Sequence, residues 1–176
     1  MSFARVRALV VVGLLGVLAL AFVVTAIVRD SQGNAGTAAG CPDGWPLADL
    51  TLHEPKDVKI NVLNATDEGG RAGAVADDFR NRKFQVQKVG NAPKGVPNVA
   101  VLRYGPKAVG SAHLLQAYFL NNAKWDYDEK RTDDVVDVIL GNNFQQLATT
   151  TEVNQSLGDA GPPEAPKGAC PSPAAK

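Results

Sequence analysis

Tyr104, Trp125 and Tyr127 are the residues of this chain whose side chains best suit a bound ligand. An aromatic ring presents a flat apolar face, and tyrosine and tryptophan add one polar group at its edge. Exposed rings beside amide side chains can therefore hold a polysaccharide. We expect these three residues to contribute to a ligand-binding surface.

Residues that could support catalysis or bind a metal are present, but their spacing fits neither chemistry. His53 and His113 stand in no recognisable arrangement with a serine or cysteine nucleophile, and no H-E-x-x-H or H-x-E pattern occurs. An acidic run fails the pattern of a calcium-binding EF-hand loop because Lys130 and Arg131 interrupt it. We expect no enzymatic activity, no cofactor and no metal. The acidic residues, which suit a solvated loop and strand edge, are Asp126, Asp128, Glu129, Asp133, Asp134 and Asp137.

A glycine-bearing turn at residues 67–73 lies between a predicted strand and a predicted helix. Backbone N–H groups at such a helix start can bind an anion. The turn has neither G-x-G-x-x-G spacing nor a P-loop lysine, and Asp67 and Glu68 would repel a phosphate. We favour a structural turn, in which Gly73 lets the helix pack closely on the sheet. The residues assigned to this structural turn are Asn64, Gly69, Gly70 and Gly73.

Hydrophobic periodicity predicts the elements that position these residues. Apolar alternation with a period of two predicts strands, and apolar residues at i, i+3, i+4 and i+7 predict amphipathic helices. The segment from Trp125 to Arg131 fits a short strand or a loop. The clear strands are expected at residues 58–63, 84–89, 99–103 and 135–140, and the helices at residues 70–83 and 106–122.

The resulting βαββαβ order predicts an α+β fold with two layers. A short loop joins the second strand to the third, which favours an antiparallel hairpin. Right-handed crossovers then give a split βαβ arrangement, a ferredoxin-like sandwich in which both helices cover one face of the sheet. The other face should meet water, a polar ligand or a partner. Its polar side chains are Lys59, Asn61, Gln85, Gln87 and Asp137.

The N-terminal part of the chain predicts a membrane anchor. Residues 1–7 carry Arg5 and Arg7, and residues 8–28 follow without a charged side chain. As a helix this run is roughly 30 Å long, which is the thickness of a bilayer core. The positive charges place residues 1–7 in the cytoplasm and the rest of the chain outside. The alternatives are a cleaved signal peptide, whose apolar region is shorter, and lipidation of Cys41 after a glycine.

The segments that flank the predicted domain carry the two cysteines. Residues 29–56 are typical of a flexible tether and lead-in, and residues 148–176 are typical of a disordered, proline-rich tail. Outside the cytoplasm we expect Cys41 and Cys170 to form a structural disulfide, in preference to a redox or metal site. The formal net charge of +0 gives no polyanion-binding signature, so we expect no binding to nucleic acid.

Four stretches within residues 57–147 resemble, in order, the LytR C-terminal domain family. They are VKINVLNATDEGGRAGAVADDF, FQVQKVGNA, VAVLRYGPK and VVDVILGNNF. The chain departs from the family pattern at Ala65, where the family has glycine. The resemblance implies a non-catalytic accessory module of the cell envelope, since the chain shows no counterpart of the catalytic domain of LytR-CpsA-Psr proteins. The implied partners are the membrane, through a single span, and either a cell-wall glycopolymer or an envelope protein.

Overall fold

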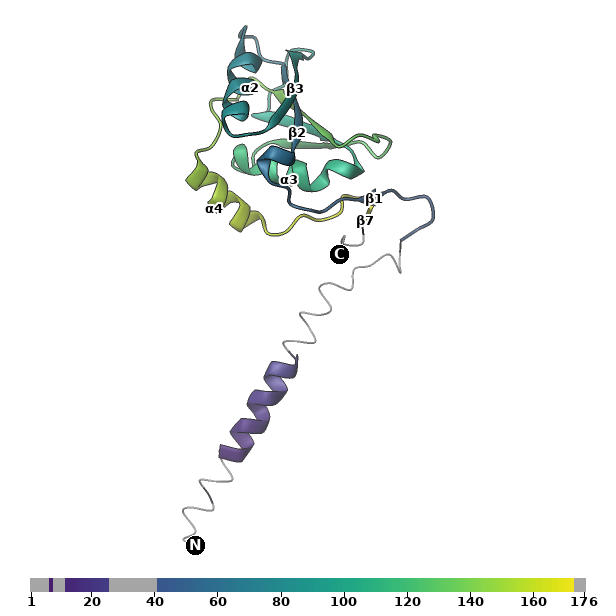
Figure 1. Ribbon diagram of the computed structural model, residues 1–176, viewed down its shortest axis with the longest axis vertical. Coiled ribbons are helices and arrows are strands. Elements are labelled where there is room, and N and C mark those ends of the chain that lie inside the picture. The colour runs from purple at the N-terminus through teal and green to yellow at the C-terminus, as the bar shows by residue number, and fades with distance from the viewer. Residues whose placement is uncertain (1–6, 8–11, 26–40, 173–176) are drawn as a thin grey trace. The chain divides into compact units, whose positions relative to one another are not determined.

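The structure is a computed structural model that describes residues 7, 12–25 and 41–172 (Figure 1). The chain divides into two compact units, Met1–Ala39 and Gly40–Lys176. The second unit contains a β-sheet with its covering helices, and the candidate site belongs to this unit.

The first unit contains a helical segment at residues 12–25, whose side chains are exposed. Among the described residues, no helix combines the length and the apolar character needed to cross a membrane. The anchor predicted at residues 8–28 falls partly on residues 8–11 and 26–28, which lie outside the described part of the chain. The anchor therefore stays a prediction.

The second unit is built on a five-stranded mixed sheet (Figure 1). Its strands are β2 (Lys59–Asn64), β3 (Gln85–Asn91), β4 (Ala100–Tyr104), β5 (Lys124–Tyr127) and β6 (Val135–Leu140). Across the sheet their order is β3-β2-β6-β4-β5. β2 runs parallel to both β3 and β6, whereas β4 runs antiparallel to β6 and parallel to β5.

Two helices cover one face of the sheet. Helix α2 (Arg71–Asn81) follows β2, and helix α3 (Val109–Tyr118) follows β4 after a short 3-10 helix at Pro106–Ala108. The units β2-α2-β3 and β4-α3-β5 run in opposite directions and step toward opposite edges of the sheet. Right-handed crossovers in both units therefore place both helices on the same face. The hydrophobic core lies between the helices and the sheet. Its largest fully buried side chains include Phe79, Ile60, Leu102, Leu115 and Leu140.

The predicted two-layer α+β class is confirmed, but the predicted ferredoxin-like strand order is wrong. β3 and β4 do not form a hairpin, because β2 and β6 lie between them. Residues 92–99 instead pass across the end of the sheet. Backbone N–H groups of residues 141–143, just after β6, donate hydrogen bonds to carbonyl groups of this crossing loop. The length of the loop was compatible with either connection, and β6 decides between them by occupying the centre of the sheet.

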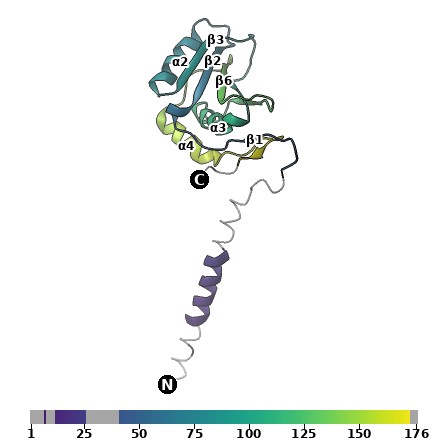
Figure 2. The ribbon, with the colours of Figure 1, turned by 45° about the vertical axis from the view of Figure 1, so that its right-hand side comes forward.

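The prediction of a disordered tail is also wrong, because the segment contains helix α4 (Thr150–Ala160) and strand β7 (Cys170–Pro171). α4 begins with a capping box: the Thr149 hydroxyl accepts a hydrogen bond from the Glu152 N–H, and the Glu152 carboxylate accepts one from the Thr149 N–H. The helix packs against α3 (Figure 2), and Val153 is buried. Burial of Ala148, Val153 and Ala169, together with the disulfide at Cys170, contributes to offsetting the entropy cost of ordering the segment.

Cys41 and Cys170 form the predicted disulfide, with a Cα–Cα distance of 5.9 Å. Beside it, strand β1 (Leu47–Ala48) pairs in parallel with β7. We call this disulfide and strand pair the terminal clamp. The lead-in is also fixed to the domain near α3, where the Gly110 N–H donates a hydrogen bond to the Asp49 carbonyl group at 2.9 Å. From Cys41 onward, the segment predicted as a flexible tether and lead-in is therefore part of the domain.

Gly141 should be intolerant of a side chain, because the crossing loop lies directly against it. A Cβ atom at Gly141 would lie 2.1 Å from the carbonyl oxygen of Asn98 and 2.8 Å from that of Val96. Gly141→Ala should therefore lower the free energy of unfolding by about 1–3 kcal/mol, as measured by urea denaturation.

Gly158→Ala on α4 is the matched control for this substitution. A Cβ atom at Gly158 would meet nothing within 4 Å, so no backbone needs to move. Alanine should raise the free energy of unfolding by up to about 1 kcal/mol, because it favours the helix. If Gly141→Ala were as stable as the parent protein, the close packing of the crossing loop would be refuted.

Candidate functional site

The three aromatic residues predicted to bind a ligand lie together at one edge of the sheet. In the register of β4 and β5, Tyr104 is opposite Tyr127 and Leu102 is opposite Trp125, so all three aromatic side chains project from the helix-covered face. The ring centroid of Tyr104 lies 5.6 Å from that of Trp125 and 5.7 Å from that of Tyr127. Trp125 is 43% exposed, so part of its indole is open to a ligand.

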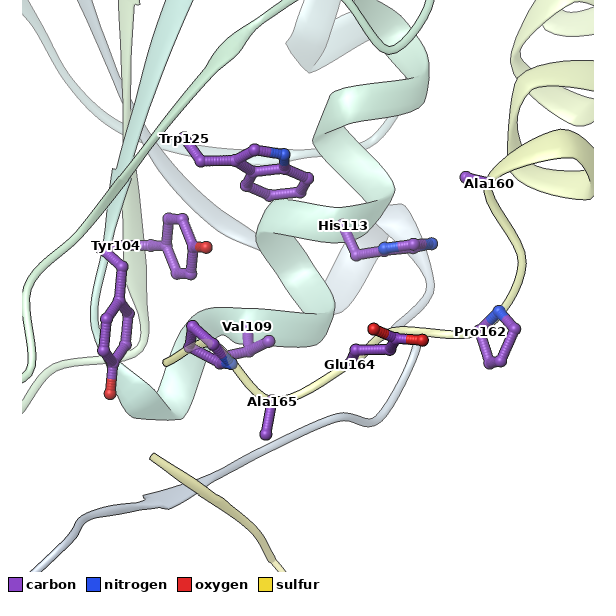
Figure 3. A pocket seen from close by; sticks show the side chains of 10 residues that line it. Tyr104, Val109, His113, Trp125, Ala160, Pro162, Glu164 and Ala165 are labelled. Carbon is purple, nitrogen blue, oxygen red and sulfur yellow. The ribbon is translucent and has the colours of Figure 1, made fainter. Parts of the chain in front are cut away.

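This aromatic cluster forms one wall of a pocket with a volume of about 560 Å³ (Figure 3). Helix α3 contributes Val109 and His113, and the segment after α4 contributes Glu164. Small-molecule sites commonly enclose about 300–1,000 Å³ and combine an apolar, aromatic lining with a few polar groups. The pocket has this composition. Its remaining lining residues are Ala160, Pro162, Ala165 and Pro166.

The wall opposite the aromatic cluster belongs to residues 161–169, which we call the terminal strap. The strap joins α4 to β7 and is held at both ends. At its start, His113 Nε2 donates a hydrogen bond to the Gly161 carbonyl group at 3.0 Å. At its end, the Cys170 N–H donates a hydrogen bond to the Pro46 carbonyl group at 3.0 Å, beside the disulfide. The terminal clamp thus fixes one wall of the pocket.

The pocket contains one acidic side chain, Glu164, and no lysine or arginine is among its lining residues. Burial raises the pKa of Tyr104 to about 12, and Tyr127 and Asp126 add to the effect, so this phenol stays neutral at physiological pH. The Tyr127 hydroxyl is buried and has no hydrogen-bond partner among the described residues. Leaving a buried hydroxyl unpaired costs about 1–3 kcal/mol, which a water molecule or a ligand could recover.

The opposite face of the sheet carries polar side chains where they were predicted, but it is not wholly polar, because the buried Val135 and Ile139 also project from it. Its charged groups pair with one another. Arg131 lies 2.8 Å from Asp137 and 2.9 Å from Asp133, and its side chain is 14% exposed. Asn61 Nδ2 also donates a hydrogen bond to Asp137, at 2.7 Å. Two further ion pairs follow the same pattern and join Lys59 to Asp134 and Arg103 to Asp126. The acidic run therefore supplies partners for basic side chains of the protein itself.

The glycine-bearing turn is organised by Asn64, at the end of β2. Its Nδ2 donates a hydrogen bond to the Glu68 carbonyl group at 2.7 Å, and its Oδ1 accepts one from the Thr66 N–H at 3.1 Å. Gly70 has a φ of +80°, a left-handed conformation that favours glycine. The prediction for Gly73 is wrong, because a Cβ atom there would meet nothing within 4 Å. Gly73 is not a site of close helix–sheet packing.

These features define a class of protein: a small two-layer α+β domain with a disulfide between its ends and an aromatic pocket beneath its C-terminal segment. Residues 57–144, half of the chain, match the family described as LytR cell envelope-related transcriptional attenuator, and the chain belongs to this LytR C-terminal family. The match includes the aromatic cluster and ends before the terminal strap.

Two individual proteins are similar to this chain. It is 26% identical over 120 residues to the cell envelope integrity protein Cei of Mycobacterium tuberculosis, an alignment that covers 66% of this chain and 55% of the relative. The chain thus spans about half the length of that relative. A crystal structure of the soluble domain of a conserved hypothetical secreted protein from Mycobacterium marinum has a TM-score of 0.53 and 24% identity, and the match covers 69% of this chain and 83% of that one. At this identity the likeness shows the fold alone.

His113 and Glu164 are polar pocket residues that periodicity did not identify. His113 lies on the predicted second helix, where nothing in the sequence points toward the aromatic cluster. Glu164 lies in the segment expected to be disordered. Two signals could have placed it: the T-x-x-E capping box at residues 149–152, which predicts a further helix, and the predicted disulfide at Cys170, which requires the chain to return to the domain.

The double variant Cys41→Ser/Cys170→Ser should be much less stable than the parent protein. The disulfide joins residues with a sequence separation of 129, so its loss greatly enlarges the conformational freedom of the unfolded chain. The chain-entropy relation gives a loss of about 4–5 kcal/mol in the free energy of unfolding, measurable by urea denaturation. The parent protein in a dithiol reductant is the control and should lose the same amount. A loss below about 1 kcal/mol would mean that α4 and the β1–β7 pair hold the strap without the disulfide.

The fold should lose stability as the pH rises from the ordinary tyrosine pKa of 10.0 to the value of about 12 for Tyr104. In this range the unfolded chain releases the phenolic proton and the folded protein retains it, so a rising pH favours unfolding. Tyr104→Phe should remove this contribution. Thermal unfolding of both proteins at a series of alkaline pH values measures the difference, and parallel pH profiles would contradict a buried neutral Tyr104.

Proposed function

We propose that this protein is a single-pass, membrane-anchored module that supports the integrity of the cell envelope by binding a wall polysaccharide outside the cytoplasm. Its family and the name of the M. tuberculosis relative support a role at the envelope. The disulfide supports an oxidising compartment. The apolar run at residues 8–28 supports attachment to the membrane.

The observation that carries the proposal is the aromatic pocket. One face of a sugar ring consists largely of C–H groups, which pack against the electron-rich face of an aromatic ring. Trp125, at 43% exposure, offers such a face beside two tyrosines. His113 and Glu164 add polar groups on the other walls, where they can orient the hydroxyl groups of a bound sugar.

The composition of the pocket favours binding over cleavage of a polysaccharide. Glycoside hydrolysis commonly uses two carboxyl groups that flank the scissile bond, one as the acid and one as the base or nucleophile. Glu164 is the carboxylate among the residues that line this pocket. We therefore propose a non-catalytic module that recognises the polymer and leaves it intact.

A second candidate function is the binding of an envelope protein, and a different surface favours it. Trp45, Leu47 and Leu52 are 45%, 50% and 49% exposed, respectively. All three belong to the lead-in. Leu47 is part of the terminal clamp, and Trp45 and Leu52 lie close to it in sequence. Exposed apolar side chains that gather on one segment commonly mark a site of protein–protein contact.

Co-sedimentation with purified cell-wall sacculi tests polysaccharide binding. The full chain, purified in a mild detergent, should pellet with sacculi that carry their glycopolymers and should remain in solution with sacculi stripped of them. Trp125→Ala should lower the apparent affinity by about tenfold or more, because a tryptophan at the centre of a site commonly dominates binding.

Trp45→Ala is the matched control, because it removes an indole of similar exposure from a residue outside the pocket lining. It should leave retention by the sacculi unchanged. Equal loss in the two variants would assign binding to general apolar adhesion, and no retention of the parent protein would refute direct wall binding. Loss in the Trp45 variant alone would place wall binding on the lead-in and would refute the pocket as the binding site.

A further inference from the structure

We infer that the pocket selects a saccharide bearing a free, protonated amino group over the same saccharide with that group acylated, and that Glu164 is the residue that makes this choice. The inference rests on the proposed function, since it names the chemical class of ligand for the same pocket. Three observations support it: the charges around the pocket, the absence of a covering cation on Trp125 among the described residues, and the hydrogen-bond acceptors that line the pocket.

The charge of the pocket favours a cation. Glu164 lines it, and its carboxylate belongs to none of the ion pairs formed among residues 41–172. A second carboxylate lies beside the strap: Glu129 Oε2 is 3.5 Å from the position that a Cβ atom would occupy if Gly168 carried a side chain. Lys167 is on the strap but is not among the lining residues. A phosphate or carboxylate group entering this pocket would face a negative charge without a cation to offset it.

Among the aromatic residues of the pocket, Trp125 is 43% exposed and can receive a cation, unlike two aromatic faces elsewhere in the domain. The guanidinium group of Arg71 lies 5.7 Å from the ring centroid of Phe144, and that of Arg82 lies 5.4 Å from the ring centroid of Tyr118. Among the described residues, no arginine or lysine covers Trp125 in this way. An ammonium group within about 6 Å of an indole face is attracted by the ring quadrupole, and tryptophan gives the strongest such contact.

The hydrogen-bonding groups of the pocket suit a ligand that donates. His113 uses its Nε2–H to bind the Gly161 carbonyl group, and in the tautomer that carries its proton on Nε2 the Nδ1 atom is left as an acceptor. The Glu164 carboxylate oxygens, which also line the pocket, are further acceptors. An ammonium group carries three donors and no acceptor, whereas an N-acetyl group adds a carbonyl oxygen, loses the charge and is bulkier.

Figure 3 shows how one ligand could use both kinds of group. Trp125 and Tyr104 extend from the strands, whereas His113 and Glu164 lie toward α3 and the strap. A sugar ring stacked on the aromatic side can therefore present a substituent, or a neighbouring sugar unit, to Glu164. The aromatic side supplies affinity for any saccharide, and the carboxylate supplies the preference for a charged amine.

Two matched probes separate these contributions: short glucosamine oligomers and N-acetylglucosamine oligomers of the same length. Each is titrated into the full chain in detergent, in a buffer above the ordinary histidine pKa of about 6.5 and below the pKa of the amine, and binding is measured calorimetrically. The parent protein should prefer the glucosamine oligomer by about two- to fivefold, because Glu164 is exposed and solvent screens an exposed ion pair. Glu164→Gln should abolish the preference by weakening the glucosamine oligomer by the same factor, and should leave the N-acetylated oligomer unaffected.

Glu54→Gln is the matched control, since it neutralises an exposed carboxylate outside the pocket and should leave the preference intact. Trp125→Ala should weaken the binding of both oligomers. Trp125→Leu, which keeps more of the apolar contact, should weaken it too if the ring face is used.

Equal affinity for both oligomers, with Trp125 still required, would overturn the inference and retain the proposed function. Binding of the glucosamine oligomer that survives the Trp125 substitutions would also overturn it, by placing the amine elsewhere. No binding of either oligomer would overturn the inference, whereas the proposed function stands or falls on retention of the parent protein by the sacculi.

Discussion

The fold depends on the insertion of β6 between two βαβ units that would otherwise share no strand pairing. β6 pairs in parallel with β2 on one side and in antiparallel fashion with β4 on the other, and it places the fully buried Val136 and Val138 beneath the helices. A two-stranded ribbon with one helix buries too little surface to be stable by itself. With β6 in the centre, both units contribute to a single core. Its position also puts β4 and β5 at one edge of the sheet, where the aromatic cluster meets solvent.

The pocket combines parts of different origin in the sequence. The matched family region supplies the aromatic wall and α3, whereas Glu164 comes from the terminal strap, beyond residue 144. In this chain the matched region therefore provides the apolar surface, and the C-terminal segment adds the carboxylate to the pocket.

The sequence predicted the strands and the first two helices of the domain well, because apolar alternation and helical periodicity depend on each segment alone. Strand order was less predictable: residues 92–99 could form a hairpin or cross the sheet, and only the pairing of β6 distinguishes the two. α4 was missed because glycine and proline in the surrounding tail outweighed the capping box at Thr149. The aromatic part of the site was predictable from residue type. The positions of His113 and the strap beside the aromatic cluster depend on tertiary packing.

The terminal clamp has a mechanical consequence. Cys41 and Cys170 close the chain between them into a covalent ring, and the whole sheet lies inside this ring. A force that pulls on the two ends of the chain passes through the S–S bond and bypasses the strands. Under such tension, the pairing of β2, β6 and β4 bears no load. A domain anchored by one end and holding a polymer in its pocket would carry force between Cys41 and the strap along a covalent path.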